Sequence, residues 1–349
     1  MRKILVTGAS GFLGSRLVRR LVERNLPIKL LVRPGSSLAA IDGVPPEACE
    51  VVRGDITIEN DVFRALAGYD RLLHVAAVYK MWARDRREIL DAAVQGTQAT
   101  LSAARKRGIR RTVVTSSVAA IGVSDRTEPL DETSEWTLHD SETYIVAKRR
   151  AEELAMRFHD DGLPVIVVNP TGIYGPGDWK PTPSGESILA YLRWRWPVGF
   201  PTSAGGLNVV DVDDVAEGHV LALERGRPGE RYILGGENLT FEQIYTLLSE
   251  LTGLRGPGRP SSRSTAMWMG RALEASARLT GKEPPLTYRL ARDFVDRYAW
   301  VSSAKAEREL GYTHRPARST LLRSVKWYVQ RGYLEPHLLR RLRLDLATG

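Results

Sequence analysis

The chain has 349 residues, 43% hydrophobic and 26% charged, a balance typical of a globular protein that can bury a full core. Its formal net charge is +9, but the charges are scattered except near the C-terminus, and no nucleic-acid-binding motif accompanies them. The one cysteine, Cys49, excludes an internal disulfide and a cysteine-built metal site, which fits a reducing cytoplasm. We expect no signal peptide, no metal site and no membrane span, because no stretch approaches the ~20 apolar residues that a span needs.

Short apolar runs alternate with longer helical patterns over the first half of the chain. Six runs predict strands, at 4–6, 28–32, 51–53, 72–75, 112–115 and 165–168. Stretches with helical periodicity lie between them, at 12–24, 61–67, 89–106 and 143–160. Apolar runs with little alternation suit a parallel sheet that is covered on both faces. The pattern therefore predicts an α/β fold with a doubly wound parallel sheet of the Rossmann type.

The character of the sequence changes after residue 170. Residues 171–207 are rich in Pro, Gly and Trp, as expected of loops over a cleft, and the Gly/Pro-rich stretch 256–260 predicts a connector. Between these, 231–234 predicts a strand that returns to the sheet, and 241–251 an amphipathic helix. We expect a Rossmann domain over 1–170 with a return segment at about 208–236, and a smaller discontinuous substrate lobe. That lobe would comprise 171–207 and 237–349.

A glycine-rich loop follows the first predicted strand and opens the first helix. Its sequence is Thr7-Gly8-Ala9-Ser10-Gly11-Phe12-Leu13-Gly14. Gly8 and Gly11 allow the backbone to turn tightly and approach a pyrophosphate, which binds the free N–H groups of a helix N-terminus. Gly14 allows the helix to pack close to the sheet. The loop therefore predicts a bound dinucleotide.

The end of the second strand indicates which dinucleotide binds. A carboxylate there would hold the ribose 2′-hydroxyl of NAD, but this chain has Arg33, Ser36 and Ser37 instead. Arginine neutralises a 2′-phosphate and serine donates to it, so NADP is predicted, with NAD as the alternative. Contacts with the adenine and with the central part of the cofactor are expected from residues after the third and fourth strands: Asp55, Ile56, Val75, Ala76, Ala77 and Val78. His74, inside the fourth strand, is expected to pack in the core.

Tyr144 and Lys148 are four residues apart at the start of a predicted helix, so their side chains share one face. A tyrosine with an unperturbed pKa of ~10 is a weak base at neutral pH, and a lysine ammonium within ~4–6 Å favours the phenolate. Such a tyrosine exchanges a proton with a substrate oxygen while hydride moves to or from a nicotinamide. Thr115, Ser116 and Ser117 end the fifth strand, at the sheet edge where ligands bind.

Together these motifs resemble those of the extended short-chain dehydrogenase/reductases, and within them the dihydroflavonol-reductase branch. The branch resemblance depends on residues 32–33, 74–76 and 169–171. The chain is also similar to bacterial hopanoid-associated sugar epimerases, in residues 79–85, 180–185, 211–219 and 226–240. The resemblance covers residues 1 to about 333.

The resemblance implies a catalytic triad of Ser117, Tyr144 and Lys148, and nicotinamide contacts from Pro170 and Thr171. It also implies a homodimer paired through the helices at 89–106 and 143–160. Ala93 is a departure, because it stands where the family usually has asparagine and cannot make that side chain's hydrogen bonds.

Three reactions are compatible with the resemblance: carbonyl reduction, sugar epimerisation and sugar dehydration. Ser117 is followed by Val118-Ala119-Ala120, which supplies no further acid or base, so dehydration is not expected. A nucleotide-sugar epimerase needs cations for a diphosphate, and the candidates are Lys180, Arg193 and Arg231. Aromatic residues that either line the cleft or pack the lobe are at least as prominent: Tyr79, Trp82, Tyr174, Trp179 and Trp196.

We therefore predict an NADP(H)-dependent oxidoreductase that interconverts a secondary alcohol and a ketone on a bulky, lipid-like or polycyclic substrate. A sugar epimerase and a non-catalytic NADP-binding regulator remain the alternatives. Nucleic acid is not an expected partner.

The C-terminal segment combines leucines with arginines. Leu338, Leu339, Leu342 and Leu346 fall on one face of a helix predicted over 336–346, and Arg340, Arg341 and Arg343 lie largely off that face. A basic amphipathic helix can rest in an anionic membrane surface. Alternatively, the leucines dock on the protein itself.

Overall fold

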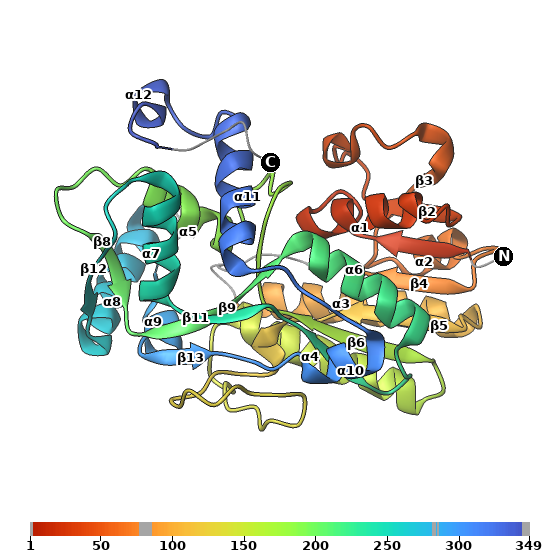
Figure 1. Ribbon diagram of the computed structural model, residues 1–349. Helices are drawn as coiled ribbons and strands as arrows, with labels where there is room; N and C mark the ends of the chain where they lie inside the picture. Colours follow the sequence, from red (N-terminus) through yellow and green to blue (C-terminus); the bar gives the residue numbers. More distant parts are fainter. Residues whose placement is uncertain (1–2, 77–85, 281–283, 285, 344–349) are drawn as a thin grey trace.

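The computed structural model describes residues 3–76, 86–280, 284 and 286–343. Within this range the main sheet has seven strands: β1 (Ile4–Thr7), β2 (Ile28–Val32), β3 (Cys49–Arg53), β4 (Arg71–His74), β5 (Arg111–Thr115), β6 (Val165–Pro170) and β10 (Arg231–Leu234). Their order is β10-β6-β5-β4-β1-β2-β3, and every neighbouring pair is parallel (Figure 1). The predicted doubly wound Rossmann sheet is thus confirmed. Its strand order reverses between β1 and β4, where such folds bind ligands.

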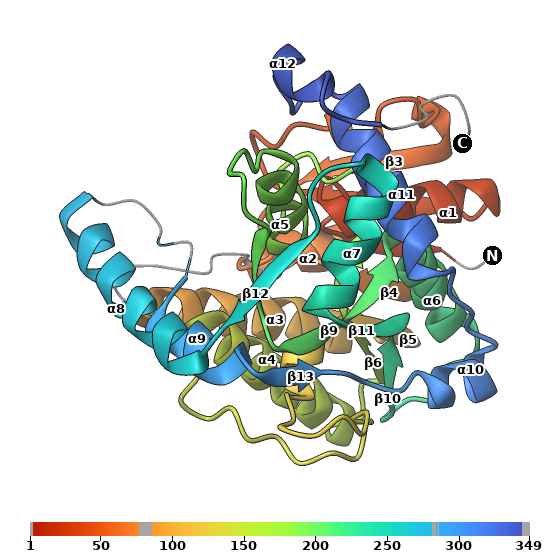
Figure 2. The same cartoon turned by 60° about the vertical axis from the view of Figure 1, so that its left-hand side comes forward.

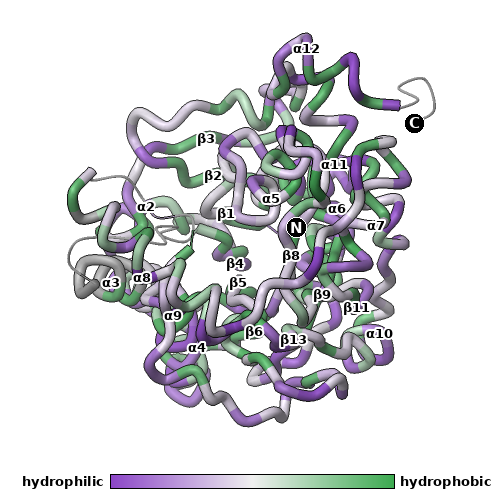
Figure 3. Tube along the Cα trace, turned by 90° about the vertical axis from the view of Figure 1, so that its left-hand side faces the viewer, coloured by the Kyte–Doolittle hydropathy of each residue, from purple (hydrophilic) through white to green (hydrophobic). Residues whose placement is uncertain are grey.

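Helices cover both faces of this sheet and bury its apolar strands. One face packs against α1 (Phe12–Glu23), α6 (Val212–Arg225) and α10 (Ala304–Leu310). The other packs against α2 (Glu59–Ala65), α3 (Arg86–Lys106) and α4 (Thr143–Asp160). Figure 3 shows hydrophobic colouring along the central strands, whose residues are buried throughout β1, β2 and β6. Burial on both faces explains why the strands appear in the sequence as apolar runs without alternation.

The second half of the chain is more regular than the sequence suggested. The stretch 171–207, expected as loops, contains β7 (Gly172–Tyr174), α5 (Pro183–Leu192), β8 (Phe200–Ser203) and the start of β9 (Gly205–Asp211). The expected connector at 256–260 is largely strand β12 (Pro257–Ser261), which pairs with β8. Pro and Gly are compatible with this strand because it lies in a two-stranded sheet with an irregular register. Three short 3₁₀ turns complete the first half: η1 (Ala39–Ile41), η2 (Pro46–Ala48) and η3 (Val118–Ala120).

The lobe is assembled around a second small sheet, in which β9 pairs with β7, β11 (Glu237–Thr240) and β13 (Arg297–Ala299). Its helices are α5, α7 (Phe241–Thr252), α8 (Arg263–Thr280), α9 (Tyr288–Phe294), α11 (Ala317–Gln330) and α12 (Pro336–Leu339). α5, α7 and α11 enclose one apolar core, and α8 stands at the outer side of the lobe in Figure 2. α10 comes from the same late part of the chain but packs against α6 and β10 of the main sheet.

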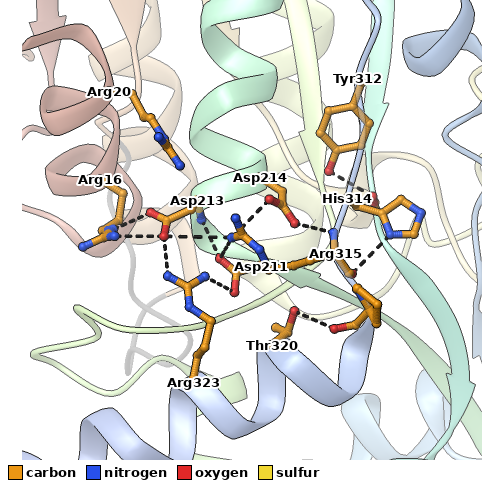
Figure 4. A network of polar contacts seen from close by, with 12 residues as sticks. Arg16, Arg20, Asp211, Asp213, Asp214, Tyr312, His314, Arg315, Thr320 and Arg323 are labelled. Carbon is orange, nitrogen blue, oxygen red and sulfur yellow. Dashed lines mark hydrogen bonds and ion pairs between the residues drawn. The ribbon is translucent and has the colours of Figure 1, made fainter. Parts of the chain in front are cut away.

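An ion-pair network joins the lobe to the Rossmann domain (Figure 4). It comprises carboxylates from the end of β9 and the start of α6, and guanidinium groups from α1, α11 and the segment before α11: Asp211, Asp213, Asp214, Arg16, Arg315 and Arg323. Burial alone would raise the pKa of Asp213, but hydrogen bonds and charge from Arg16 and Arg323 lower it to about 2. Because Asp213 pairs with both Arg16 of α1 and Arg323 of α11, the network connects the lobe to the helix that follows the glycine-rich loop.

The C-terminal segment differs from the continuous helix predicted over 336–346. α12 is a single turn, and Leu338 is buried in the lobe core while Leu339 and Leu342 pack partly against it. Leu346 lies outside the described residues. The described leucines therefore dock on the protein, and the arginines between them stay exposed. No helix in the described part of the chain is long and apolar enough to cross a bilayer.

Candidate active site

The loop between β1 and α1 is too tight for side chains at two of its glycines. Gly8 has a φ of +78°, and a Cβ there would lie 2.6 Å from the backbone nitrogen of Ala76. A Cβ on Gly14 would overlap the carbonyl oxygen of Gly8. The hydroxyl of Thr7 accepts from the amide of Ala76 at 3.2 Å and ties the loop to the segment after β4.

The N-terminus of α1 has no side-chain cap among the described residues. Gly11 occupies the cap position with extended backbone, and the first turn holds no acidic residue. Ser10 lies in the loop before it, and Phe12, Leu13 and Gly14 form the first turn. Their N–H groups point along the helix axis, where a pyrophosphate would complete their hydrogen bonds. The loop thus fits the dinucleotide that its sequence predicted.

Arg33 lies exposed in the turn after β2, beside a second arginine. Arg53 ends the neighbouring β3 and donates to the carbonyl oxygens of Arg33 at 3.1 Å and Ser36 at 3.0 Å. The hydroxyl of Ser37 accepts from the amide of Ala39. Sequence reasoning missed Arg53. The signal was its position, because Arg53 is the register partner of Val32, the last residue of β2.

Some of the residues expected to contact the adenine and the central part of the cofactor lie in the described part of the chain. One carboxylate oxygen of Asp55 accepts from the amide and hydroxyl of Thr57, at 2.9 and 2.8 Å, so a local turn orients this side chain. Ile56 and Ala76 line the pocket described next, and Val75 follows β4. Ala77 and Val78 lie outside the described residues.

A pocket opens at the carboxyl ends of β4 and β5. Its lining residues come from both strands, α3, α4 and the segment after β3: Ile56, His74, Ala76, Gly96, Thr97, Val114, Thr115, Ser116, Tyr144, Ala147, Lys148, Ala151 and Glu152. The hydroxyl of Ser116 is buried and has no partner within the described part of the chain. An unpartnered hydroxyl of this kind is available to a bound ligand.

Tyr144 and Lys148 line this pocket, and Ser117 lies next to it. Ser117 caps η3 directly after β5, and its hydroxyl hydrogen-bonds Tyr144 in the first turn of α4. One turn further along α4, the ammonium of Lys148 donates to the carbonyl oxygen of Thr115 at 3.3 Å. The three residues that the sequence singled out are therefore brought together by the end of one strand and the start of one helix.

The electrostatics of the site favour a neutral tyrosine. Burial raises the pKa of Tyr144 to about 12, although the hydrogen bond from Ser117 lowers it in part. Burial lowers the pKa of Lys148 to about 8, and the charge of Glu152 opposes that shift. The sequence argument expected lysine to lower the tyrosine pKa, whereas burial dominates here. At neutral pH the site therefore holds a protonated phenol beside an ammonium.

A buried carboxylate supports the lysine. Glu152 is 2% exposed and lies one turn after Lys148 on α4. It accepts from Arg231 at 2.8 Å and from the side-chain amide of Asn169 at 2.6 Å. Asn169 also donates to the carbonyl oxygen of Ser117 at 3.1 Å. Sequence reasoning missed Glu152, although its spacing of four from Lys148 extends the same helical face.

His74 is buried in β4 and also lines the pocket. The Thr7 hydroxyl and the His74 Nδ1 are 2.9 Å apart. Burial and the nearby charge of Lys148 lower the pKa of His74 to about 4, so the ring is neutral at pH 7. A neutral, buried ring agrees with the packing role expected for it.

Pro170 and Thr171 lie at the end of β6. The Cα of Pro170 is the register partner of Leu234 in β10, and the hydroxyl of Thr171 donates to the Asn208 side-chain oxygen at 2.7 Å. These contacts fix both residues between the main sheet and β9, at the carboxyl edge where a nicotinamide contact was expected.

The aromatic candidates separate into different environments. Tyr174 is buried in the lobe core, and Trp179 packs edge-on against Trp327 of α11. Trp196 lines a different cavity on the lobe surface, away from Tyr144. Tyr79 and Trp82 lie outside the described residues. The fold thus supplies packing partners for Tyr174 and Trp179.

Ala93 lies within α3, but its side chain is outside what the structure describes. Among the described residues, no group of three or more side chains is arranged to hold a metal ion.

A parallel sheet with a glycine loop at its switch point, and a Ser–Tyr–Lys site at the same edge, define a nicotinamide-dependent oxidoreductase of the extended short-chain dehydrogenase/reductase class. Comparison with protein families agrees, because the profile of the NAD dependent epimerase/dehydratase family matches residues 4–235. The chain belongs to this family.

Individual relatives match along almost the whole chain. A Synechocystis protein named as a dihydroflavonol 4-reductase is 36% identical over 95% of each chain. Sterol demethylase protein B of Methylococcus capsulatus is 33% identical over 95% of this chain and 99% of its own. Among solved structures, gox2253 superposes with a TM-score of 0.84 at 38% identity, covering 96% of this chain and all (100%) of the other.

Proposed function

We propose that this protein reduces a ketone to a secondary alcohol, and catalyses the reverse oxidation, with NADP(H) as the redox partner. The observation that carries the proposal is that Tyr144 and Lys148 line one pocket at the carboxyl edge of the sheet, where Ser117 hydrogen-bonds Tyr144. When bound, the reduced nicotinamide supplies a hydride to the carbonyl carbon. Tyr144 gives its proton to the carbonyl oxygen, Ser117 orients that oxygen, and the Lys148 ammonium stabilises the phenolate until solvent returns the proton.

NADP is preferred over NAD in this proposal because of the turn after β2. Arg33 and Arg53 bring two guanidinium groups to it, Ser36 and Ser37 add hydroxyls, and residues 33–39 contain no acid. Arginine binds a 2′-phosphate strongly, whereas the 2′-hydroxyl of NAD donates a hydrogen bond to a carboxylate.

A bulky lipid-like or polycyclic substrate is proposed from the chemistry of the site and from the relatives. The pocket is lined by apolar groups such as Ile56, Val114 and Ala147 around a few polar ones. One relative is named for a flavonoid reductase and another for a sterol demethylase. Trp179, at the exposed side of the lobe, remains our candidate for substrate contact.

A sugar epimerase is the second candidate, which the name of the family favours. Two of the three cations proposed for its diphosphate have other partners, however. Arg231 pairs with the buried Glu152, and Arg193 donates to the carbonyl oxygen of Tyr333 at 3.1 Å. Lys180 is exposed. A non-catalytic NADP-binding regulator is less favoured because it needs no proton donor at the position of Tyr144.

The experiment is a panel assay followed by loss of NADPH absorbance. Sterol-type and aliphatic ketones would be compared with UDP- and dTDP-sugars, and the sugars would also be checked for epimer formation. Consumption of NADPH with a bulky ketone supports the proposal. Epimer formation without net cofactor consumption supports the epimerase, and neither result with any class supports the regulator.

We also propose a cytoplasmic homodimer paired through α3 and α4. These helices pack against one another on one face of the sheet, and α4 exposes Arg150, Glu153 and Arg157.

A further inference from the structure

A second cavity lies on the surface of the lobe, far along the chain from the active-site residues. Three segments converge on it: the end of α5 with the loop that follows, the segment after α7, and the C-terminal segment. Its lining residues are Tyr191, Trp194, Arg195, Trp196, Pro197, Leu254, Arg255 and Arg341. Among these described residues, three are arginines and none is acidic, which makes the cavity suitable for an anion.

The positive charge extends beyond the cavity wall. Further exposed arginines lie on the same three segments and on β12: Arg193, Arg259, Arg340 and Arg343. Glu335 contacts the group only loosely, with one of its oxygens 3.7 Å from Arg195, and both side chains are mostly exposed. Figure 3 shows hydrophilic and hydrophobic residues alternating over this end of the chain, around α12. The surface therefore has a strong excess of guanidinium groups.

Apolar side chains project from the same surface. Trp196 is 67% exposed and Val198 is 60% exposed, both in the loop after α5. The loop is held in place by internal hydrogen bonds, because the Trp194 indole donates to the Val198 carbonyl at 2.9 Å and Arg341 donates to the Trp194 carbonyl at 2.8 Å. An exposed tryptophan on a braced loop, surrounded by arginines, has the composition of a membrane-interface anchor.

The C-terminal leucines cannot serve as that anchor, since Leu338 is buried in the lobe core. The packing of these leucines also places Arg341 in the wall of the cavity. Arg340 and Arg343, which are close to Arg341 in the sequence, lie near it. The backbone amide of Arg343 donates to the Thr252 carbonyl at 2.8 Å, which fixes this part of the segment next to the end of α7.

We propose that this surface docks the protein on an anionic membrane. Arg195, Arg255 and Arg341 take a lipid phosphate group in the cavity, while Trp196 and Val198 enter the boundary between head groups and acyl chains. Because the arginines of this surface complement negatively charged head groups, the partner is an anionic lipid rather than a neutral membrane or a protein. Vesicle binding is measured without substrate or turnover, so its result is independent of the proposed reaction.

The test is co-sedimentation of the full chain with vesicles of phosphatidylglycerol mixed into phosphatidylcholine, and with phosphatidylcholine alone, at low and high salt. We expect binding only to the anionic vesicles, weakened by salt. Arg195→Glu/Arg255→Glu should weaken binding by more than about 25-fold, because the loss of each arginine costs about fivefold and each new carboxylate is repelled by the anionic surface. Trp196→Ala should weaken it several-fold.

Two matched controls separate this surface from general effects of charge and exposure. Arg110→Glu/Arg126→Glu makes the same change in net charge at exposed positions of the Rossmann domain and should leave binding near the parent level. Trp268→Ala removes a tryptophan of similar exposure, 69%, on α8 and should also bind like the parent. Circular dichroism and melting temperature confirm that each variant is folded.

Inorganic phosphate and glycerol phosphate at millimolar concentration serve as soluble competitors. Vesicle binding that persists with both competitors at constant ionic strength supports membrane docking. Displacement by inorganic phosphate or by glycerol phosphate indicates a soluble anion site and overturns the proposal. Binding to neutral vesicles, binding lost only in Trp268→Ala, or no binding to any vesicle also overturns it.

Discussion

The carboxylate of Glu152 accepts a hydrogen bond from the side-chain amide of Asn169 at 2.6 Å, while the same amide donates to the Ser117 carbonyl at 3.1 Å. Both partners of this amide are acceptors, so its orientation is fixed. The arrangement connects α4, which carries Tyr144 and Lys148, to the strand end that carries Ser117. Glu152 also supplies the negative charge that opposes the loss of the Lys148 proton. We therefore propose that Glu152 is a positioning residue for the three proposed catalytic residues.

Replacing Glu152 by glutamine tests this role. The change keeps the side-chain size but removes the charge, so the pKa of Lys148 should fall below its value of about 8. The basic limb of the pH profile of kcat/KM should then move to lower pH, and turnover at pH 8 should drop about tenfold.

Glu153→Gln is the matched control, because Glu153 is the next residue, is 51% exposed and pairs with Arg149 on the surface. It should leave the profile in place. If Glu152→Gln lowers the melting temperature but leaves the basic limb of the kcat/KM profile at the parent pH, Glu152 contributes to stability and not to catalysis. The melting temperature of each variant distinguishes the two results.

Tyr144→Phe removes the proposed proton donor but little of the packing. We expect turnover to fall by at least ~10²-fold, the contribution of one general acid, with NADPH affinity nearly unchanged. Stopped-flow or steady-state rates and a fluorescence titration of NADPH measure the two quantities. Tyr69→Phe, on the far edge near Glu50, is the control. Near-native turnover in Tyr144→Phe would remove Tyr144 from the mechanism.

Arg33→Asp should reverse the preference between the two cofactors. The change deletes a cation near the proposed 2′-phosphate and installs an acceptor for a 2′-hydroxyl. Arg53→Gln should also weaken NADPH binding, through loss of charge and of the brace on the Arg33 and Ser36 carbonyls, but should leave NADH binding less affected. Each should lower NADPH affinity by about tenfold or more, as for a charge-assisted hydrogen bond. Unchanged NADPH titrations in both variants would refute the assignment, and Arg110→Gln serves as control.

The stability of the fold should fall as the pH is lowered from about 6.5 toward about 4. Burial lowers the pKa of both His74 and His219 from 6.5 to about 4. Between these values the unfolded chain binds more protons than the native one, so protonation favours unfolding. Above pH 6.5 both histidines are neutral in either state and the protein keeps its full stability. Between pH 6.5 and about 4, the free energy of unfolding falls by about 3 kcal/mol for each histidine.

Urea unfolding at several pH values measures this dependence. His219→Asn should flatten the curve between pH 6.5 and 4 relative to the parent, whatever its effect at pH 7. His337→Asn changes an exposed histidine next to Glu335 and should keep the parent slope. An equal slope in the parent and in His219→Asn would contradict the prediction.

The proposed dimer should appear in light scattering as a mass near twice the 38.8 kDa of one chain at micromolar concentration. Arg150→Glu/Arg157→Glu reverses two charges on the exposed side of α4 and should shift the mass toward one chain. A monomeric parent protein would rule out the pairing, and unchanged dimer mass in the variant would place the interface elsewhere.

The local features of this protein could be predicted from its sequence because short-range spacing determines them. The glycine loop between a strand and a helix, the spacing of four between Tyr144 and Lys148, and the apolar strands of the parallel sheet are all patterns of neighbouring residues. The limits of β2, α4 and β10 agreed with the sequence pattern to the residue.

Tertiary structure decided the features whose partners lie far apart in the chain. Glu152 gains its role only because Asn169 and Arg231 come from other strands, and Arg53 reaches the Arg33 turn only because β2 and β3 are neighbours. The balance between burial and charge that keeps Tyr144 protonated likewise depends on what surrounds it in space. The C-terminal leucines have the spacing of a membrane-facing stripe, but the lobe core offers Leu338 an apolar partner within the same molecule, and burial there removes it from water.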